Sequence, residues 1–217
     1  MSGFKRVSLL ASFALSATLL AMPAAAESFA LGAKVGTTGL GLEATWRATD
    51  SVNLRAGYYA FDYSTDLDEE GIEYDGDLRL RNAAFFADWH PFRGSFRLSA
   101  GGVQSGNEFR GSADGDLDVG DNTYAAVVDA KVGWSGFAPY LGLGFGNAVG
   151  GGRLSFSFDL GVMFTGSPDV RLDGTVNDPA LENAFRQDLE RERANLADEL
   201  KDAKYYPVVS LGLAWRF

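Results

Sequence analysis

The sequence predicts an all-β fold, a closed antiparallel transmembrane β-barrel, and three observations carry this prediction. The last ten residues alternate between apolar and small or polar side chains and end on an aromatic residue. The chain begins with a basic and then apolar segment typical of exported proteins. Between the two ends, short alternating segments are separated by turn residues. We expect about ten strands, with eight as the alternative, and one amphipathic helix before the last strand.

Residues 1–26 are typical of a cleavable signal peptide. Lys5 and Arg6 precede an apolar run, and Ala24 to Ala26 form a small-residue cleavage site. The run is shorter than the roughly 20 residues that a membrane-spanning helix needs, which disfavours a helical anchor. We therefore predict cleavage near Ala26 and a barrel domain over residues 27–217.

Composition excludes several classes of protein. Cleavage removes Lys5 and Arg6, so the net charge of −10 falls to −12, which disfavours nucleic acid as a partner. The chain has no cysteine and therefore no disulfide or thiol chemistry. Its 27 glycines permit bends in curved strands, and its 16 Phe, 8 Tyr and 4 Trp suit membrane interfaces. A soluble β-sandwich would share this composition, but the two chain ends favour a barrel.

Ten segments alternate and end at turn residues. They are residues 28–36, 39–47, 52–63, 77–89, 95–104, 123–134, 137–146, 153–164, 169–176 and 205–217. We predict short periplasmic turns at 48–51, 90–94, 135–136 and 165–168. We predict outer connections at 37–38, 64–76, 106–122, 147–152 and 177–204. Eight strands remain possible if 169–176 does not pair and one further segment drops out.

Alternation also assigns charged side chains to the barrel interior. The lumen-lining candidates are Glu43, Arg47, Arg55, Arg79, Arg81, Arg97, Asp129, Lys131, Asp159, Arg171, Asp173 and Arg216. The pattern breaks near Asn82 and Ala83, which predicts a bulge in that strand. Two interpretations follow. Arginine–carboxylate pairs could fill a narrow lumen, or the excess of basic residues could form a small, anion-favouring pore.

The apolar stripe of the last strand forms a candidate assembly signal. Its members are Val209, Leu211, Leu213, Trp215 and Phe217. This strand resembles the closing strand of bacterial outer-membrane barrels, in which the terminal aromatic residue is read by the assembly machinery. The resemblance implies that machinery as a partner, together with outer-membrane lipid and lipopolysaccharide.

Residues 177–204 have helical rather than strand periodicity. Asp178 can cap the helix and Pro179 suits its first position. Apolar residues recur at spacings of four or seven, at Leu181, Phe185, Leu189, Leu196 and Leu200. We predict a helical insertion on the outer side, lying across the barrel mouth with this stripe buried. It could serve as a lid or as a partner-binding element.

The remaining features give no catalytic, cofactor-binding or metal residues. The acidic runs 66–70 and 114–121 lack the pattern of a calcium-binding loop and predict a solvated outer rim. Divalent cations that bridge this rim to lipopolysaccharide are the alternative. His90 is the one histidine and lies in a predicted turn, so a barrel lipid hydrolase is the weakest function class.

Several motifs follow one another in a familiar order. They are residues 88–92 (DWHPF), 138–144 (APYLGLG), 145–150 (FGNAVG), 166–168 (GSP) and 206–213 (YPVVSLGL). The chain resembles a largely uncharacterised family of small proteobacterial outer-membrane β-barrel proteins. The resemblance implies fold and location and no functional residues. The expected role is a structural or interaction barrel, with a narrow porin-like channel as the alternative.

Overall fold

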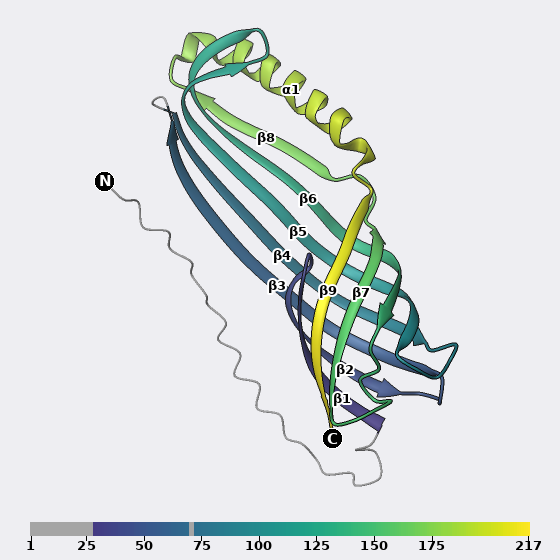
Figure 1. Cartoon of the computed structure of the whole chain (residues 1–217). Helices are drawn as coiled ribbons and strands as arrows, with labels where there is room; N and C mark the ends of the chain where they lie inside the picture. Colours follow the sequence, from purple (N-terminus) through teal and green to yellow (C-terminus); the bar gives the residue numbers. More distant parts are fainter. Residues whose placement is uncertain (1–27, 70–71) are drawn as a thin grey trace.

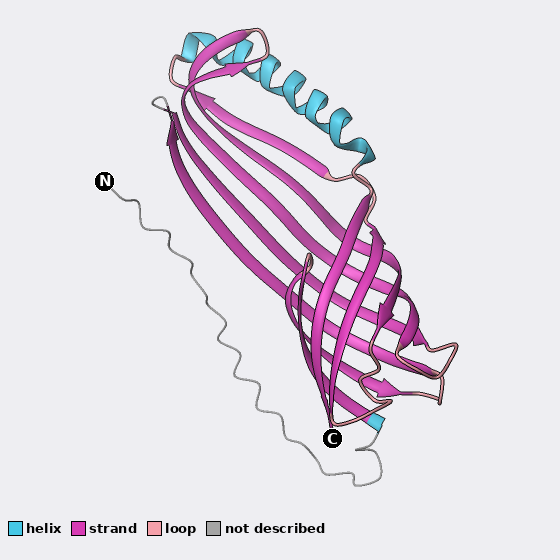
Figure 2. Cartoon of the chain, viewed as in Figure 1, coloured by secondary structure: helices cyan, strands magenta, loops and turns pink. Residues whose placement is uncertain are grey.

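The computed structural model describes residues 28–69 and 72–217, and it is built almost entirely from strands (Figures 1 and 2). The predicted signal peptide lies outside the described residues. The strands are β1 (Phe29–Gly36), β2 (Gly39–Arg47), β3 (Val52–Glu69), β4 (Ile72–Trp89), β5 (Phe96–Val119), β6 (Asn122–Phe145), β7 (Leu154–Phe164), β8 (Asp169–Val176) and β9 (Tyr205–Arg216). One α-helix, α1 (Glu182–Glu199), lies between β8 and β9, flanked by two short 3₁₀ turns.

Eight of the strands close into a ring, which confirms the predicted antiparallel barrel. Neighbours pair in the order β1 to β7, and β9 joins β7 back to β1. Strand β8 stands outside the ring, because it pairs with β6 beyond the part of β6 that pairs with β7. The ring therefore has the smaller of the two predicted strand numbers.

The count of ten was too high because two predicted turns are not turns. Residues 123–134 and 137–146 form the single strand β6, and Gly136 sits inside it with a φ of +124°. Glycine tolerates this left-handed backbone, so the strand can bend without ending. At 165–168 the chain does not reverse, since β7 and β8 both run antiparallel to β6 along one edge. Each error removes one expected reversal of the chain direction, so the two errors cancel. Helix α1 therefore lies at the end of the barrel where the sequence predicted it, opposite the short turns.

The two ends of the barrel differ. At the short-turn end lie the connections 48–51, 90–95 and 146–153, together with Phe29 and the carboxyl terminus. The prediction had placed 147–152 at the other end, and the false turn at 135–136 explains this error. At the extended end, the segments predicted as loops 64–76 and 106–122 are mostly strand, in β3 to β6.

Strands β3 to β6 are too long for a membrane alone. A transmembrane strand needs about 9–11 residues, and β5 and β6 have 24 residues each. At about 3.4 Å per residue they reach roughly 80 Å. In Figure 1 they sweep away from the shorter β1, β2, β7 and β9 and carry β8 with them. The upper halves of β3 to β6, with β8, therefore form a sheet that projects beyond the barrel.

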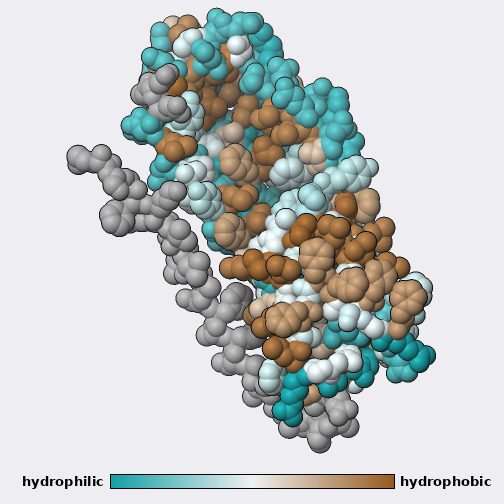
Figure 3. All heavy atoms as spheres, viewed as in Figure 1, coloured by the Kyte–Doolittle hydropathy of each residue, from teal (hydrophilic) through white to brown (hydrophobic). Residues whose placement is uncertain are grey.

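Polarity inverts along these long strands while the alternation of side chains continues. On β3, the outward side chains of Leu54 and Tyr58 give way to Asp62 and Asp66. On the inner face of β3, the charged Arg55 in the barrel is followed by apolar residues towards the extended end. Figure 3 shows apolar side chains covering the barrel half of the viewed face and polar side chains at its ends. The outward face of the barrel is therefore suited to contact with lipid, and the outward face beyond it is suited to contact with water.

Helix α1 and the projecting sheet enclose a second apolar core. Phe185 is 1% exposed and its ring lies 5.2 Å from that of Tyr124 in an edge-on contact. Leu189 joins them, together with Leu117 and Val119 of β5. The predicted stripe is therefore buried in part, whereas Leu181 is exposed. The helix lies along β8 and not across the barrel mouth, which corrects the predicted position (Figure 1).

A buried carboxylate fastens the helix to the sheet. Asp188 accepts hydrogen bonds from the Tyr124 hydroxyl at 2.7 Å and from Asn122 Nδ2 at 2.8 Å, and it pairs with Arg191. The bond from Tyr124, followed by the bond from Asn122, holds the pKa of Asp188 below its usual value. Ionised Asp188 therefore stabilises the docked helix.

We expect the helix to loosen in acid. A carboxyl whose pKa is lowered by folding stabilises the protein above its unfolded pKa, about 3.9, and this contribution is lost as the pH falls through the lower folded value. Amide exchange in α1, corrected for the intrinsic effect of pH, should rise between pH 6 and pH 3. In Asp188→Asn this pH dependence should be much smaller, and only the weaker contribution of the exposed Glu190–Arg193 pair should remain. An unchanged acid response in that variant would contradict the assignment.

Candidate functional site: the closed barrel interior

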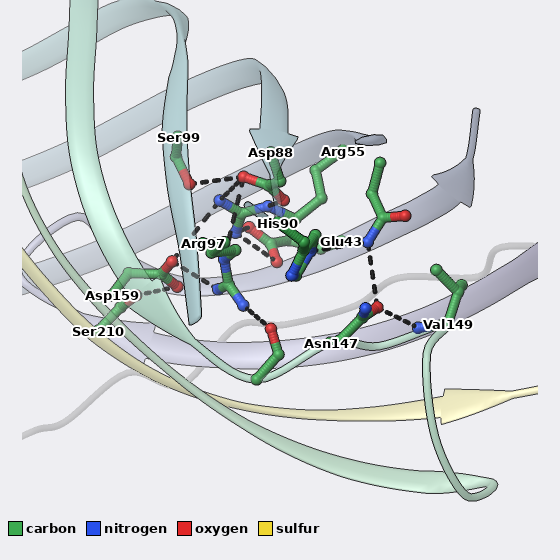
Figure 4. Close-up of polar contacts among 12 residues, drawn as sticks. Glu43, Arg55, Asp88, His90, Arg97, Ser99, Asn147, Val149, Asp159 and Ser210 are labelled. Carbon is green, nitrogen blue, oxygen red and sulfur yellow. Dashed lines mark hydrogen bonds and ion pairs between the residues drawn. The ribbon is translucent and has the colours of Figure 1, made fainter. Parts of the chain in front are cut away.

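Six ionisable side chains meet inside the barrel, each from a different strand, and their signs alternate around the ring. They are Lys34 of β1, Glu43 of β2, Arg55 of β3, Asp88 of β4, Arg97 of β5 and Asp159 of β7. All six are at least 93% buried. We call this group the ion network, and Figure 4 labels each of its members except Lys34.

Arg55 is the centre of the ion network. Its Nη1 lies 3.0 Å from Glu43 Oε1, and its Nε and Nη2 lie 2.6 and 3.1 Å from the two carboxylate oxygens of Asp88. Its Nη2 also lies 3.6 Å from Asp159 Oδ1. A planar guanidinium suits such paired contacts with carboxylates.

The other two cations complete the network. Lys34 Nζ lies 3.1 Å from Glu43 Oε2 and also pairs with Asp159. Arg97 Nη2 lies 2.5 Å from Asp159 Oδ1. Three cations face three anions, so the described interior charges at this level balance. Buried charges are stable in a protein when they are paired and hydrogen-bonded in this way.

Neutral side chains supply further bonds to the carboxylates. The Ser99 hydroxyl donates to Asp88 at 2.6 Å and the Ser210 hydroxyl to Asp159 at 3.4 Å (Figure 4). The Tyr59 hydroxyl donates to Glu43. These bonds hold the carboxylates in place, so the ion network is a fixed part of the fold.

An apolar layer lies between the ion network and the extended end. It consists of Tyr59, Ala84, Phe86, Val103, Ala138, Tyr140, Met163 and Val208. The rings of Phe86 and Tyr140 are 4.8 Å apart, and the guanidinium of Arg55 lies 4.9 Å from the centre of the Phe86 ring. An eight-stranded barrel is narrow enough for such side chains to fill it.

His90 lies on the other side of the ion network, near the short-turn end. Asn53 Nδ2 donates to its Nε2 at 3.0 Å and to Asn147 Oδ1 at 3.1 Å. The proton of the neutral ring therefore lies on Nδ1, which donates to the Gly94 carbonyl at 2.9 Å. Both ring nitrogens are thus engaged in holding turns together, which is a structural role.

Two small cavities flank the ion network. One is lined on the short-turn side by residues that include Asn53, His90 and Ser157. The other is lined towards the extended end by residues that include Thr38, Asn82 and the apolar layer. Each has a volume of about 20 Å³, enough for a water molecule. The arrangement can hold isolated water, but a hydrated ion is larger than either space.

The structure divides the twelve lumen-lining candidates into two groups. Glu43, Arg55, Arg97 and Asp159 lie in the ion network, and Arg47 and Arg216 lie half-buried on the inner face near the short-turn end. Six others point outward from the projecting sheet and do not line the lumen: Arg79, Arg81, Asp129, Lys131, Arg171 and Asp173. The prediction assumed that charged side chains point into the barrel. In the projecting sheet the charged side chains point outward instead, so the assumption fails there.

Sequence reasoning missed two members of the ion network. Lys34 shares its face with Gly32, opposite the apolar Leu31 and Val35, so the alternation of β1 already placed it inward. Asp88 shares its face with Ala84 and Phe86, opposite the apolar Phe85 and Trp89, so the alternation of this part of β4 also placed it inward. A bulge was expected near Asn82. The register between β4 and β5 is the same on both sides of this point, so there is no bulge.

The described residues show two further facts about possible sites. No helix in this part of the chain is long and apolar enough to cross a membrane. Within residues 28–69 and 72–217, no three His, Cys, Asp or Glu side chains are grouped so that they could hold a metal ion.

The fold is similar to that of two outer-membrane proteins of Acinetobacter baumannii with crystal structures. CarO2 aligns with a TM-score of 0.60 and 22% identity over 87% of this chain and 98% of that chain. CarO aligns with a TM-score of 0.57 and 25% identity over 87% and 97%. The similarity to CarO2 shows the fold alone. With the similarity to CarO, it supports an outer-membrane β-barrel. No protein-family model and no curated protein matches the chain.

Proposed function

We propose that this protein is an outer-membrane barrel that is closed to solutes and presents its projecting sheet and helix as a contact surface outside the cell. The observation that carries the proposal is the ion network, whose six buried charges alternate around the ring and balance. The apolar layer blocks the path through the barrel interior at a second level, between the ion network and the extended end.

The orientation follows from the two ends. Bacterial barrels have short periplasmic turns and longer outer segments, so the projecting sheet and α1 face outward. The Val209 to Phe217 stripe points to the lipid side of β9. Its reading by the assembly machinery, and contact of the outer rim with lipopolysaccharide, stay predictions.

Conductance tests the proposal. The purified protein, refolded and inserted in a planar bilayer, should show no reproducible single-channel steps. The control is a variant with both closures weakened, Arg97→Ser with Phe86→Ala, for which a leak is expected because one cation and one large ring leave the same path. Regular steps from the unaltered protein would contradict the closed barrel.

A narrow anion-favouring channel is the second candidate, and the placement of the charges weakens it. The expected excess of basic residues in the lumen included four that face outward: Arg79, Arg81, Lys131 and Arg171. A balanced ion network gives no preference for anions. A lipid hydrolase has less support, because His90 is held by Asn53 and Gly94.

Deletion of residues 180–203 should leave conductance unchanged. Helix α1 packs on β8 and on the far part of the projecting sheet, so its removal opens no path through the ion network. The bilayer measurement above, made on the deletion variant, checks this. An increase in conductance would restore the lid interpretation.

A further inference from the structure

Strand β3 has an edge that no other described strand covers. It pairs with β2 only up to Ala60, because β2 starts at Gly39. Beyond that point, residues 61–69 pair with β4 on one side, and none of the described strands pairs with them on the other. An antiparallel strand directs half of its backbone N–H and C=O groups to each side. Residues 61–68, the free edge, therefore present open backbone groups over about 27 Å.

The inner face of the free edge is apolar and accessible. Phe61, Tyr63 and Leu67 are 38%, 47% and 62% exposed. The same face continues onto β4 and β5, where Tyr74 and Phe109 are also exposed. Figure 3 shows apolar side chains on the viewed face of the projecting part, between polar margins. Side chains of an added strand would find apolar neighbours here.

The outer face of the free edge is acidic and lacks compensating charge. Asp66 lies directly opposite Asp75 of β4, and Asp68 lies opposite Glu73. Like charges at such positions destabilise an antiparallel pair. None of these four carboxylates forms an ion pair with a described basic residue, whereas Asp62 lies 2.6 Å from Arg81. Positive charge added beside Asp66 and Asp68 would relieve this repulsion.

We propose that the free edge binds an extended cationic peptide by strand addition. Its alternate apolar side chains lie beside Phe61, Tyr63 and Leu67, and its basic side chains lie beside Asp66 and Asp68. Backbone bonds supply affinity and the two side-chain rows supply specificity. A second copy of this chain is disfavoured as the occupant, since it would bring two acidic rows together.

This inference rests on the proposed role of the projecting sheet as a contact surface, but its test does not involve conductance. The probe is a fluorescent nine-residue peptide that alternates lysine and valine. Binding to the full chain in nanodiscs is measured by anisotropy. A peptide of the same composition with its valines contiguous should bind at least tenfold more weakly, because it cannot present the two rows.

N-methylation gives a signature of strand addition. A peptide methylated on alternate amides loses the donors of one edge only. One of the two possible methylation patterns should abolish binding and the other should be tolerated. Equal binding of both methylated peptides would overturn the proposal, because attraction to charge alone does not depend on a particular backbone edge.

Two matched variants locate the site. Asp66→Asn with Asp68→Asn should weaken binding roughly fivefold to tenfold, as expected for two exposed ion pairs. Asp116→Asn with Asp129→Asn removes the same charge from the outer faces of β5 and β6 and should leave binding unchanged. Equal weakening in both variants would overturn the site. Concentration-dependent dimerisation that the first variant enhances would assign the edge to a second copy instead.

Discussion

Arg55→Met is expected to destabilise the barrel by about 3–5 kcal/mol, the range for breaking a buried ion pair by removing one partner. Arg55 contacts all three carboxylates of the ion network. Its guanidinium nitrogens lie 3.0 Å from a carboxylate oxygen of Glu43, 2.6 Å from one of Asp88 and 3.6 Å from one of Asp159. Methionine fills similar space but leaves these carboxylates short of their shared cation. Urea unfolding of the refolded protein, followed by tryptophan fluorescence, measures the change.

The matched control is Arg47→Met. Arg47 lies on the same inner face near the short-turn end and is half-buried, so its replacement should change the free energy of unfolding by less than about 0.5 kcal/mol, as for an ordinary surface substitution. If both variants lose the same stability, the effect belongs to arginine content and not to the ion network. A fully stable Arg55→Met would show that the carboxylates are neutral or hydrated.

Phe185→Ala is expected to detach helix α1 while the barrel stays closed. Loss of a buried phenylalanine costs about 3–5 kcal/mol, and Phe185 is the largest fully buried side chain of the helix. It packs on Tyr124 and against Gly174, where a Cβ would lie 3.0 Å from its ring. Trypsin should then cleave at Arg186, Arg191 or Arg193 much faster than in the unaltered protein.

Two comparisons make this result specific. The exposed Leu181 on the same segment can be changed to alanine as a control, and its cleavage rate should not change. Gel mobility of unboiled samples reports the barrel and should be unaffected in Phe185→Ala. Loss of the folded band in that variant would mean that the projecting sheet and the barrel unfold as one unit.

The sequence alone predicts a strand and its two faces correctly where the same side chains, apolar or polar, face lipid along the whole strand. Strand β9 keeps an apolar lipid face over its full length, and its alternation predicted it correctly. The helix before it was predicted from its period and from Asp178. The side chain of Asp178 caps the 3₁₀ turn Pro179–Leu181 that leads into α1, and not α1 itself, by accepting from the Ala180 N–H at 2.9 Å. These local signals do not depend on partners distant in the chain.

Where a strand crosses from lipid to water, the same rule fails. Arg79 and Arg81 alternate correctly with Leu80 and Asn82, but which set faces inward depends on the height of the residue above the membrane. A single sequence does not state this height. The Ser135-Gly136 pair likewise has the composition of a turn, and only its continuous pairing with Ser105 and Gly106 of β5 shows that the strand runs on. Long-range pairing decided both points.

The reversal of polarity on β3 to β6 also determines how deeply the molecule sits. A shift of one residue pair towards the barrel would draw Asp62, Arg81 and Glu108 into the edge of the hydrocarbon. The cost is about 0–1 kcal/mol for each arginine or lysine near the interface and rises to about 2–4 kcal/mol as the side chain approaches the midplane, with less for the acids. A shift the other way would expose rows of lipid-facing rings to water. The reversal of polarity on four strands at once therefore fixes both the depth and the tilt of the barrel in the membrane, and it holds the projecting sheet at a constant height above the lipid headgroups.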